Sequence, residues 1–250
     1  MMPRTYEGNQ PYPKFPKDFK VYIEGHCFRQ GTIMMFARAG CKSAESIEDA
    51  DLVVFLGGED IDPELYGEKP HKHTSFNPRR DAREVAVFDK CIELKKPMFG
   101  ICRGMQFIHA KSGGKLHQHV VGHAGRPHDI IDLESGDTLR ATSLHHQMCV
   151  ENEKCIPLAY AVPGTTQSAV YEGHGYAVHD PKHKDLEAAV YLEQRAIGVQ
   201  GHPEIDGESP YVKWCLNRVL DLLFELKMMD EGTAPLSKKE RMEQRKKFAA

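Results

Sequence analysis

A cysteine between two glycines stands where an apolar segment gives way to a helix-forming one. Residues 99–106 read F-G-I-C-R-G-M-Q, and the run at 97–101 predicts a buried strand. The pattern G-x-C-x-G at a strand-to-helix corner is that of a nucleophile elbow, in which a tight turn presents the side chain to a cleft. The amino end of a helix favours the thiolate form of a cysteine. The pattern therefore predicts that Cys102 is a nucleophile.

A histidine and a carboxylate that can complete such a site follow a hundred residues later, in G-H-P-E at 201–204. His202 and Glu204 are two positions apart, so in an extended chain their side chains project to the same side and Glu204 can orient the imidazole. A lone cysteine is more often a small core residue, and a lone His-Pro-Glu is usually a turn. Together with the elbow, however, these residues predict a Cys-His-Glu triad.

Length and charge exclude several classes of protein. The 250 residues suffice for one large α/β domain with an ample core. The 33 basic and 36 acidic residues nearly balance, so nothing indicates binding to nucleic acid or to an anionic membrane. No apolar run reaches the roughly 20 residues of a membrane span, and the first residues lack the apolar core of a signal peptide. The seven cysteines are odd in number and lack C-x-x-C spacing, which predicts a reducing compartment, the cytoplasm, without a disulfide framework.

Strand-like and helix-like segments alternate through the first half of the chain. This order predicts an α/β fold with a single doubly wound, mostly parallel sheet and helices on both faces. We expect strands at 21–23, 52–56 and 97–101, then shorter ones at 138–142, 158–162, 169–172, 188–192 and 197–200. We expect helices at 28–39, 80–96 and 105–110, and a last helix through 227 that is capped by Ser209 and Pro210.

The predicted domain covers residues 19–230. Residues 1–18, rich in proline and lysine, predict a loosely ordered N-terminal arm, and residues 231–250 predict a charged tail or helix. In parallel sheets, ligands bind beyond the carboxyl ends of the strands. The Gly57-Gly58 turn, the elbow and His202 should all emerge at that edge.

Taken in order, these segments resemble class I glutamine amidotransferase-type domains, and in particular the branch that includes the γ-glutamyl hydrolases. The similarity extends from residue 21 to residue 226 and implies a class I glutamine amidotransferase or flavodoxin-like fold. Its most specific marks are the elbow, V-Q-G-H-P-E at 199–204, and G-G-E-D-I-D-P-E-L-Y-G-E at 57–68, which is similar to a segment of bacterial γ-glutamyl-γ-aminobutyrate hydrolases. Segments 80–84 and 143–147 are similar to other parts of that branch.

The resemblance implies a role for each matching position. Cys102 would be the nucleophile, His202 its general base and then acid, and Glu204 the orienting carboxylate. The backbone N–H groups of Gly58 and Arg103 would form the oxyanion hole. The residues expected to bind the γ-glutamyl group are Gly57, Gln106, Ser143, Leu144, His145 and His146.

One position departs from the family pattern. Many relatives carry an aromatic residue before His-Pro-Glu, where this chain has Gly201. The triad itself is unchanged, so activity is still expected. We expect the missing aromatic ring to leave more room near the histidine, and Gly201→Trp to narrow the range of leaving groups.

Fourteen histidines raise the alternative of a metal site. They lack the paired cysteines or the H-E-x-x-H framework of known zinc sites. We therefore expect polar loop or interface histidines and no metal. The histidines in question are His117, His119, His123 and His128, with His71 and His73.

The implied activity is hydrolysis of γ-glutamyl amide or isopeptide bonds through a γ-glutamyl thioester, with release of glutamate and without a cofactor. The substrate would be a small γ-glutamyl conjugate or glutamine. One alternative is a glutaminase that delivers ammonia to a separate ligase or synthetase in trans, because this chain has no P-loop or synthetase domain of its own. A second is a non-catalytic binding module, against which the complete triad argues. A homodimer is compatible with the sequence.

Overall fold

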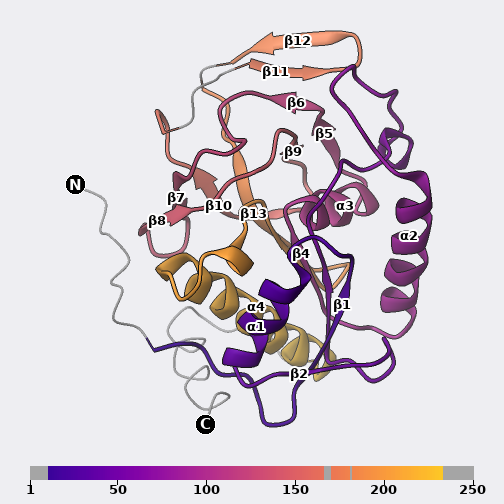
Figure 1. The fold of residues 1–250 in the computed structure, drawn as a ribbon, viewed down its shortest axis with the longest axis vertical. Coiled ribbons are helices and arrows are strands. Elements are labelled where there is room, and N and C mark those ends of the chain that lie inside the picture. The colour runs from indigo at the N-terminus through magenta and orange to yellow at the C-terminus, as the bar shows by residue number, and fades with distance from the viewer. Residues whose placement is uncertain (1–10, 166–169, 181, 233–250) are drawn as a thin grey trace.

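The computed structural model describes residues 11–165, 170–180 and 182–232. It has a mixed α/β fold around a large, mostly parallel sheet of nine strands (Figure 1). Five strands pair in parallel in the order β2-β1-β3-β4-β14. Their bounds are β1 Lys20–Glu24, β2 Lys42–Ser43, β3 Leu52–Phe55, β4 Met98–Ile101 and β14 Ala196–Val199. These include the buried strands predicted from the apolar runs at 52–56 and 97–101.

The sheet continues beyond β14 with four antiparallel pairings, which the sequence did not predict. The order here is β14-β13-β10-β7-β8, so only β13 and β7 run against the other strands. The added strands are β7 His128–Asp132, β8 Thr138–Ala141, β10 Ile156–Ala161 and β13 Leu186–Tyr191. The border between the parallel and antiparallel halves therefore runs along β14, the strand that leads to His202.

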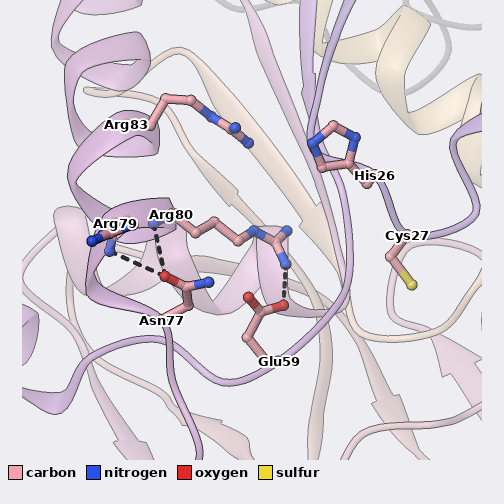
Figure 2. A pocket seen from close by; sticks show the side chains of 7 residues that line it. All are labelled: His26, Cys27, Glu59, Asn77, Arg79, Arg80 and Arg83. Carbon is pink, nitrogen blue, oxygen red and sulfur yellow. Dashed lines mark hydrogen bonds and ion pairs between the residues drawn. The ribbon is translucent and has the colours of Figure 1, made fainter.

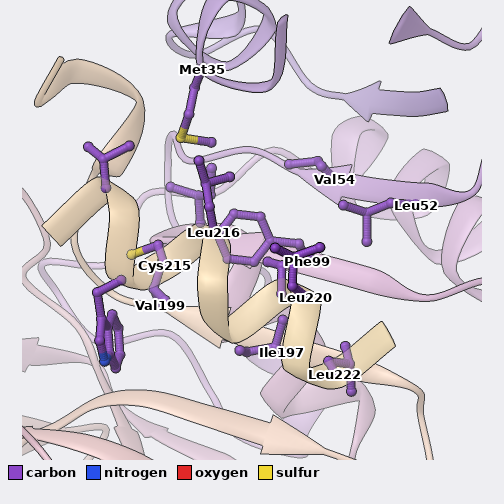
Figure 3. Close-up of a cluster of buried hydrophobic side chains, with 14 of the residues drawn as sticks. Met35, Leu52, Val54, Phe99, Ile197, Val199, Cys215, Leu216, Leu220 and Leu222 are labelled. Atoms are coloured by element: carbon purple, nitrogen blue, oxygen red, sulfur yellow. The ribbon is translucent and has the colours of Figure 1, made fainter. Parts of the chain in front are cut away.

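Helices pack on both faces of the sheet because side chains of a strand alternate between faces. Leu52 and Val54 face one hydrophobic cluster, which contains α1 (Arg29–Arg38) and α4 (Pro210–Asp230). Val53 and Phe55 face the other, which contains α2 (Pro78–Glu93) and α3 (Arg103–Lys111). Figure 3 shows α4 lying across the first of these clusters.

The start of the last helix follows the predicted signals, and two other helix ends, at α2 and α1, have capping residues as well. The Ser209 side chain accepts a hydrogen bond from the Val212 N–H at the start of α4, and Pro210 is its first residue. Asn77 caps α2 in the same way, by accepting from Arg79 and Arg80. Gly40 follows α1 with a φ of 90°, a conformation that glycine adopts readily.

Two small sheets lie beside the central one. One has the order β12-β11-β6 and the other pairs β5 with β9. Apart from β11, these short strands were not predicted. The bounds are β5 Lys115–His117, β6 His119–Val120, β9 Met148–Val150, β11 Val170–Gly173 and β12 Tyr176–His179, and the 3₁₀ helices are η1 Pro63–Tyr66 and η2 Pro203–Ile205.

The chain ends fall largely outside the described residues. Of the predicted arm, residues 1–10 lie outside, as do residues 233–250 of the predicted tail. In the described part of the arm, Phe15 is buried in the core and the Tyr12 hydroxyl donates to the Met35 carbonyl at 3.1 Å. Among the described helices, none has the length and apolar character needed to cross a membrane.

Candidate active site

The corner between β4 and α3 is a tight nucleophile elbow. Cys102, at the N-cap of α3, has φ 54° and ψ −110°, a backbone conformation rare for a side chain with a Cβ. A Cβ on Gly100 would lie 2.5 Å from the backbone of Gly104, and a Cβ on Gly104 would collide with the Phe55 carbonyl. Both glycines are therefore required by close backbone approach, as predicted, and the geometry holds the buried thiol at the carboxyl edge of the sheet.

The structure brings His202 and Glu204 to this thiol. The Glu204 Oε1 atom lies 2.7 Å from His202 Nδ1, and a side-chain hydrogen bond links His202 to Cys102. A Cβ on Gly57 would lie 2.9 Å from His202 Cε1 and 3.5 Å from Cys102 Cβ, so Gly57 lines the narrow space between them. This is the geometry of nucleophile, base and orienting group.

The surroundings of His202 set its charge. Burial alone lowers its pKa, but the hydrogen bonds to Cys102 and Glu204 and the charges of both groups outweigh burial and raise the pKa to about 10. His202 therefore carries a proton at neutral pH that it can give to a departing nitrogen. Two contacts that the sequence did not indicate hold His202 in place. Its backbone N–H donates to the Thr142 carbonyl at 2.9 Å, and the Phe28 ring packs edge-on against its imidazole, with 5.5 Å between ring centroids.

Two backbone N–H groups close to Cys102 in the chain or in space are without a protein acceptor. In the described part of the chain, the N–H groups of Gly58 and Arg103 donate to no backbone or side-chain acceptor. Arg103 is the first residue of α3, whose initial N–H groups have no partner within the helix. Gly58 has a φ of 141°, which a side chain would strain. The two positions predicted for the oxyanion hole therefore both carry free donors.

A buried ion network behind the site connects these two donors. Glu84 of α2 is fully buried and pairs with both Arg103 and Arg80, the latter at 2.7 Å. Arg80 Nη2 also donates to the carbonyls of Leu56 at 3.1 Å and Gly57 at 2.8 Å. Glu84 thus fixes the elbow helix relative to the turn before Gly58. Sequence reasoning gave this network no role, although segment 80–84 was one of the family matches.

The other predicted binding residues lie in different environments. Gln106 is buried and donates from Nε2 to the Gln147 carbonyl at 3.3 Å. The Ser143 hydroxyl is buried without a hydrogen-bond partner among the described residues, whereas Leu144 is exposed.

The rings of His145 and His146 diverge. His145 is buried, with Nδ1 at 2.9 Å from the Gln147 carbonyl and Nε2 directed to Glu187. Its ring nitrogens therefore face the protein interior. His146 is partly exposed and its Nε2 lies 3.0 Å from Asp60 Oδ1. Of this pair, His146 is the one with exposed ring surface.

The expectation of extra room at Gly201 is wrong. A Cβ at this position would lie 2.5 Å from the Tyr211 hydroxyl and 3.0 Å from the Thr142 carbonyl. Tyr211 of α4 therefore fills the space next to Gly201 that the absent side chain was expected to leave. A tryptophan at 201 would have to displace the Tyr211 hydroxyl, and its effect on the range of leaving groups stays a prediction.

A cavity of about 360 Å³ adjoins the Gly57-Gly58 turn. Figure 2 shows Arg80 and Arg83 extending from α2 towards the loop that carries His26 and Cys27. This loop continues into Phe28, which contacts His202. Arg80 is held by Glu59 and Glu84, and Arg83 by Glu24 at 2.6 Å. The remaining arginine of the lining, Arg79, has no carboxylate partner among the described residues.

Comparison with known proteins identifies the family. The sequence model of the Peptidase C26 family matches residues 30–204, well over half of the chain. The chain belongs to the Peptidase C26 family. The match contains the whole of the elbow, the Gly57-Gly58 turn and the His202-Glu204 pair.

Relatives of this Peptidase C26 chain place it in the class I glutamine amidotransferase-like superfamily. It is 32% identical over 167 residues to the glutamine amidotransferase-like protein YvdE of Lactococcus lactis, covering 64% of this chain and 69% of that one. It is 31% identical over 228 residues to protein NtpR of Enterococcus hirae, covering 82% and 87%. More distant matches, at 24 to 29% identity, include small chains of carbamoyl phosphate synthase. A glutamine amidotransferase structure from Thermotoga maritima shares the fold, with a TM-score of 0.52, 15% identity and 94% coverage of both chains.

Proposed function

We propose that this Peptidase C26 protein hydrolyses γ-glutamyl amide or isopeptide bonds through a γ-glutamyl thioester on Cys102. The observation that carries the proposal is the buried Cys102-His202-Glu204 set, next to which two backbone N–H groups, those of Gly58 and Arg103, have no acceptor among the described residues. This arrangement suits attack on an amide carbonyl, because charge develops on the carbonyl oxygen and on the leaving nitrogen in the transition state.

The steps follow from the positions of these groups. Cys102 Sγ attacks the γ-carbonyl carbon, and the new oxyanion accepts hydrogen bonds from the N–H groups of Gly58 and Arg103. His202 gives its Nε2 proton to the nitrogen, and the C–N bond breaks to release the amine and leave a thioester. A water molecule then transfers a proton to His202 Nε2 and attacks the thioester carbonyl, and glutamate leaves as the Cys102 thiolate and the protonated His202, the pair that began the reaction, are restored. Glu204 orients the ring in both its protonated and its neutral form.

The substrate side of the site favours a γ-glutamyl group on one flank and an anionic leaving group on the other. The unpartnered Ser143 hydroxyl and the Gln106 amide are the groups proposed to hold the amino-acid end of the γ-glutamyl unit. The leaving nitrogen must lie beside His202, and the loop from there leads to the arginine-lined cavity. We therefore place a carboxylate of the leaving amine near Arg79.

A substrate panel tests this proposal. We expect γ-glutamylglycine, whose leaving group has a carboxylate, to be hydrolysed with a higher kcat/KM than γ-glutamylethylamide or glutamine. Glutamate release by the purified protein, with Cys102→Ala as the blank, measures each rate. Arg79→Ala should lower kcat/KM for γ-glutamylglycine by roughly fivefold, about 1 kcal/mol for an exposed ion pair, and leave γ-glutamylethylamide unaffected. Equal losses for both substrates would contradict the assigned position of the carboxylate.

The pH dependence should report the proton on His202. Its pKa is raised from 6.5 to about 10, so the acid form is present at neutral pH and is lost as the pH rises through about 10. Above that pH, we expect kcat/KM for γ-glutamylglycine to fall by about tenfold per pH unit, because activity then requires one proton that His202 is losing. Since Glu204 is one cause of the raised pKa, Glu204→Gln should move this limb to lower pH. Full pH–rate profiles of both proteins make the comparison, and coincident alkaline limbs would rule out His202 as the acid.

A glutaminase that supplies ammonia to a separate ligase is the second candidate. It is favoured by the relatives named as glutamine amidotransferase-like and as synthase small chains. Rapid, Cys102-dependent turnover of free glutamine in the panel above, with slow turnover of γ-glutamylglycine, would favour it over the hydrolase. An absence of Cys102-dependent turnover together with unreactive Cys102 in alkylation would instead favour a non-catalytic module.

A further inference from the structure

Three histidines and a glutamate meet inside the antiparallel half of the molecule. Glu187 lies on β13, His128 begins β7, and His123 and His145 lie in the loops that precede β7 and follow β8. All four side chains are buried, with at most 3% of any residue exposed. Figure 1 shows β7 and β13 in the same part of the sheet. The sequence predicted His123 and His128 to be polar loop or interface residues, and their burial departs from that expectation.

One nitrogen of each imidazole points to Glu187. The Oε1 atom of Glu187 lies 2.8 Å from His128 Nε2, 3.4 Å from His123 Nδ1 and 3.7 Å from His145 Nε2. Among the described residues, His123, His128 and Glu187 are a group whose ligand atoms all lie within 4.8 Å of one another. Ligand atoms around a tetrahedral zinc ion, at its usual bond lengths, are separated by about 3.3 Å. The distances from Glu187 Oε1 to the three nitrogens lie on both sides of that value, and His145 lies at the edge of the group of three.

The other nitrogen of each imidazole faces an oxygen acceptor. His123 Nε2 lies 2.9 Å from Asp185 Oδ2, and Asp185 is itself held by the Tyr171 hydroxyl at 2.6 Å. His145 Nδ1 lies 2.9 Å from the Gln147 carbonyl, and His128 Nδ1 lies 3.4 Å from the Arg126 carbonyl. Histidines that bind metals are oriented in this way, since the outer N–H bond to oxygen leaves the inner nitrogen with a free lone pair.

The centre of the group is poorly satisfied by the protein alone. His123 Nδ1, His145 Nε2 and Glu187 Oε2 are buried without a hydrogen-bond partner among the described residues. His128 Nε2 lies 2.8 Å from Glu187 Oε1, a hydrogen bond in which the carboxylate accepts. The three atoms without a partner are costly to bury unless a donor or a cation lies between them. A divalent cation would replace the His128 proton and satisfy the group together.

We propose that His123, His128 and Glu187 bind a divalent transition-metal cation, with zinc the best match to the ligand set, and that His145 closes the site as the fourth ligand. The first three offer ligand atoms within 4.8 Å of one another, and imidazole and carboxylate are ligands that zinc accepts. With His145 as the fourth ligand in a buried place, the site is closed and structural. It lies apart from Cys102 and is independent of the activity proposed above.

Hydrogen bonds connect the site to the catalytic region at two places. The Gln200 N–H donates to the Glu187 carbonyl at 2.8 Å, just before His202 in the chain. The Gln147 carbonyl that orients His145 also accepts from Gln106. The cation would therefore fasten the loop after β8 to the strands that lead to His202, and it would touch no substrate.

The metal content of the full chain, produced without a polyhistidine tag, tests the site. We expect about one equivalent of zinc per chain by elemental analysis in the wild type and in the His73→Ala control, whose histidine is exposed and lies outside the group. Glu187→Gln should lose it. After removal with a chelator, Zn²⁺ titrated in competition with a chromophoric chelator should rebind to the wild type and raise its Tm.

A second variant covers the case in which Glu187→Gln does not fold. Asp185→Asn keeps all four ligands and weakens only the orientation of His123, so zinc affinity should fall by about 10- to 100-fold. Wild-type protein with less than about a tenth of an equivalent of metal that also fails to bind added Zn²⁺ more tightly than Asp185→Asn would overturn the proposal. In that case a protonated imidazole holds the group together.

Discussion

Cys102→Ala is expected to lower kcat for γ-glutamylglycine by about 10⁴-fold or more, since removing the nucleophile of a triad typically costs this much or more. The remaining groups cannot form the thioester. His202→Ala should cost a similar factor, and the double variant little more, because residues of a triad act as one unit. Glutamate release at saturating substrate measures all three.

The fold should survive this substitution. Alanine occupies the same strained backbone conformation as Cys102, and the thiol is a small part of the buried surface. The Tm of Cys102→Ala should therefore match the wild type. Cys41→Ala is a suitable control, because Cys41 is a half-buried free cysteine outside the active site. Residual activity of Cys102→Ala within tenfold of the wild type would exclude Cys102 as the nucleophile.

Glu84→Ala is expected to lower the free energy of unfolding by about 3 kcal/mol, the lower end of the usual cost of breaking a buried ion pair by removing one partner. The substitution removes the carboxylate that joins Arg80 and Arg103, whereas Arg80 keeps its pair with Glu59 and Arg103 its pair with Asp81. Denaturant unfolding measures the loss. Glu93→Ala, on the exposed last turn of the same helix, should change stability by less than about 1 kcal/mol, because its pair with Lys90 lies at the surface.

Glu84 should also affect catalysis in the folded fraction. Its partners Arg80 and Arg103 hold the two segments that carry the free N–H groups. If these segments shift relative to each other, the N–H groups stabilise the oxyanion less well, while binding of the substrate itself changes less. We expect kcat to fall while KM changes little when Glu84→Gln is assayed under conditions where it remains folded. An unchanged kcat in that variant would leave the network with a purely structural role.

The elbow turn and the His202-Glu204 pair were predictable because their signals are local, whereas the approach of Cys102 to His202 was expected only from the order of the motifs and the family resemblance. Two glycines at fixed distances from Cys102 and a carboxylate two residues after His202 specify a turn and a pair by chain geometry alone. The caps of the last helix were predictable for the same reason, since Ser209 and Pro210 act within one turn.

The rest depends on contacts between distant segments. The antiparallel half of the sheet requires registers among β7, β8, β10 and β13 that short apolar runs do not specify. His123 and Glu187 meet across more than sixty residues of chain, and Tyr211 reaches Gly201 from the last helix. No spacing rule connects such residues, so the buried histidine group and the filled space beside Gly201 were both missed.

The burial of α3 limits which positions of this protein can change their residue during evolution. Every residue from Arg103 to Ala110 is buried, so the helix behind the nucleophile has almost no surface on which substitutions are neutral. By contrast, the loop of His26 and Cys27 lines the cavity beside the Gly57-Gly58 turn, and Leu144 is exposed. Sequence variation among descendants of this protein should therefore concentrate in these loops. We expect the range of accepted leaving groups to change through substitutions there, while Cys102 and α3 stay constant.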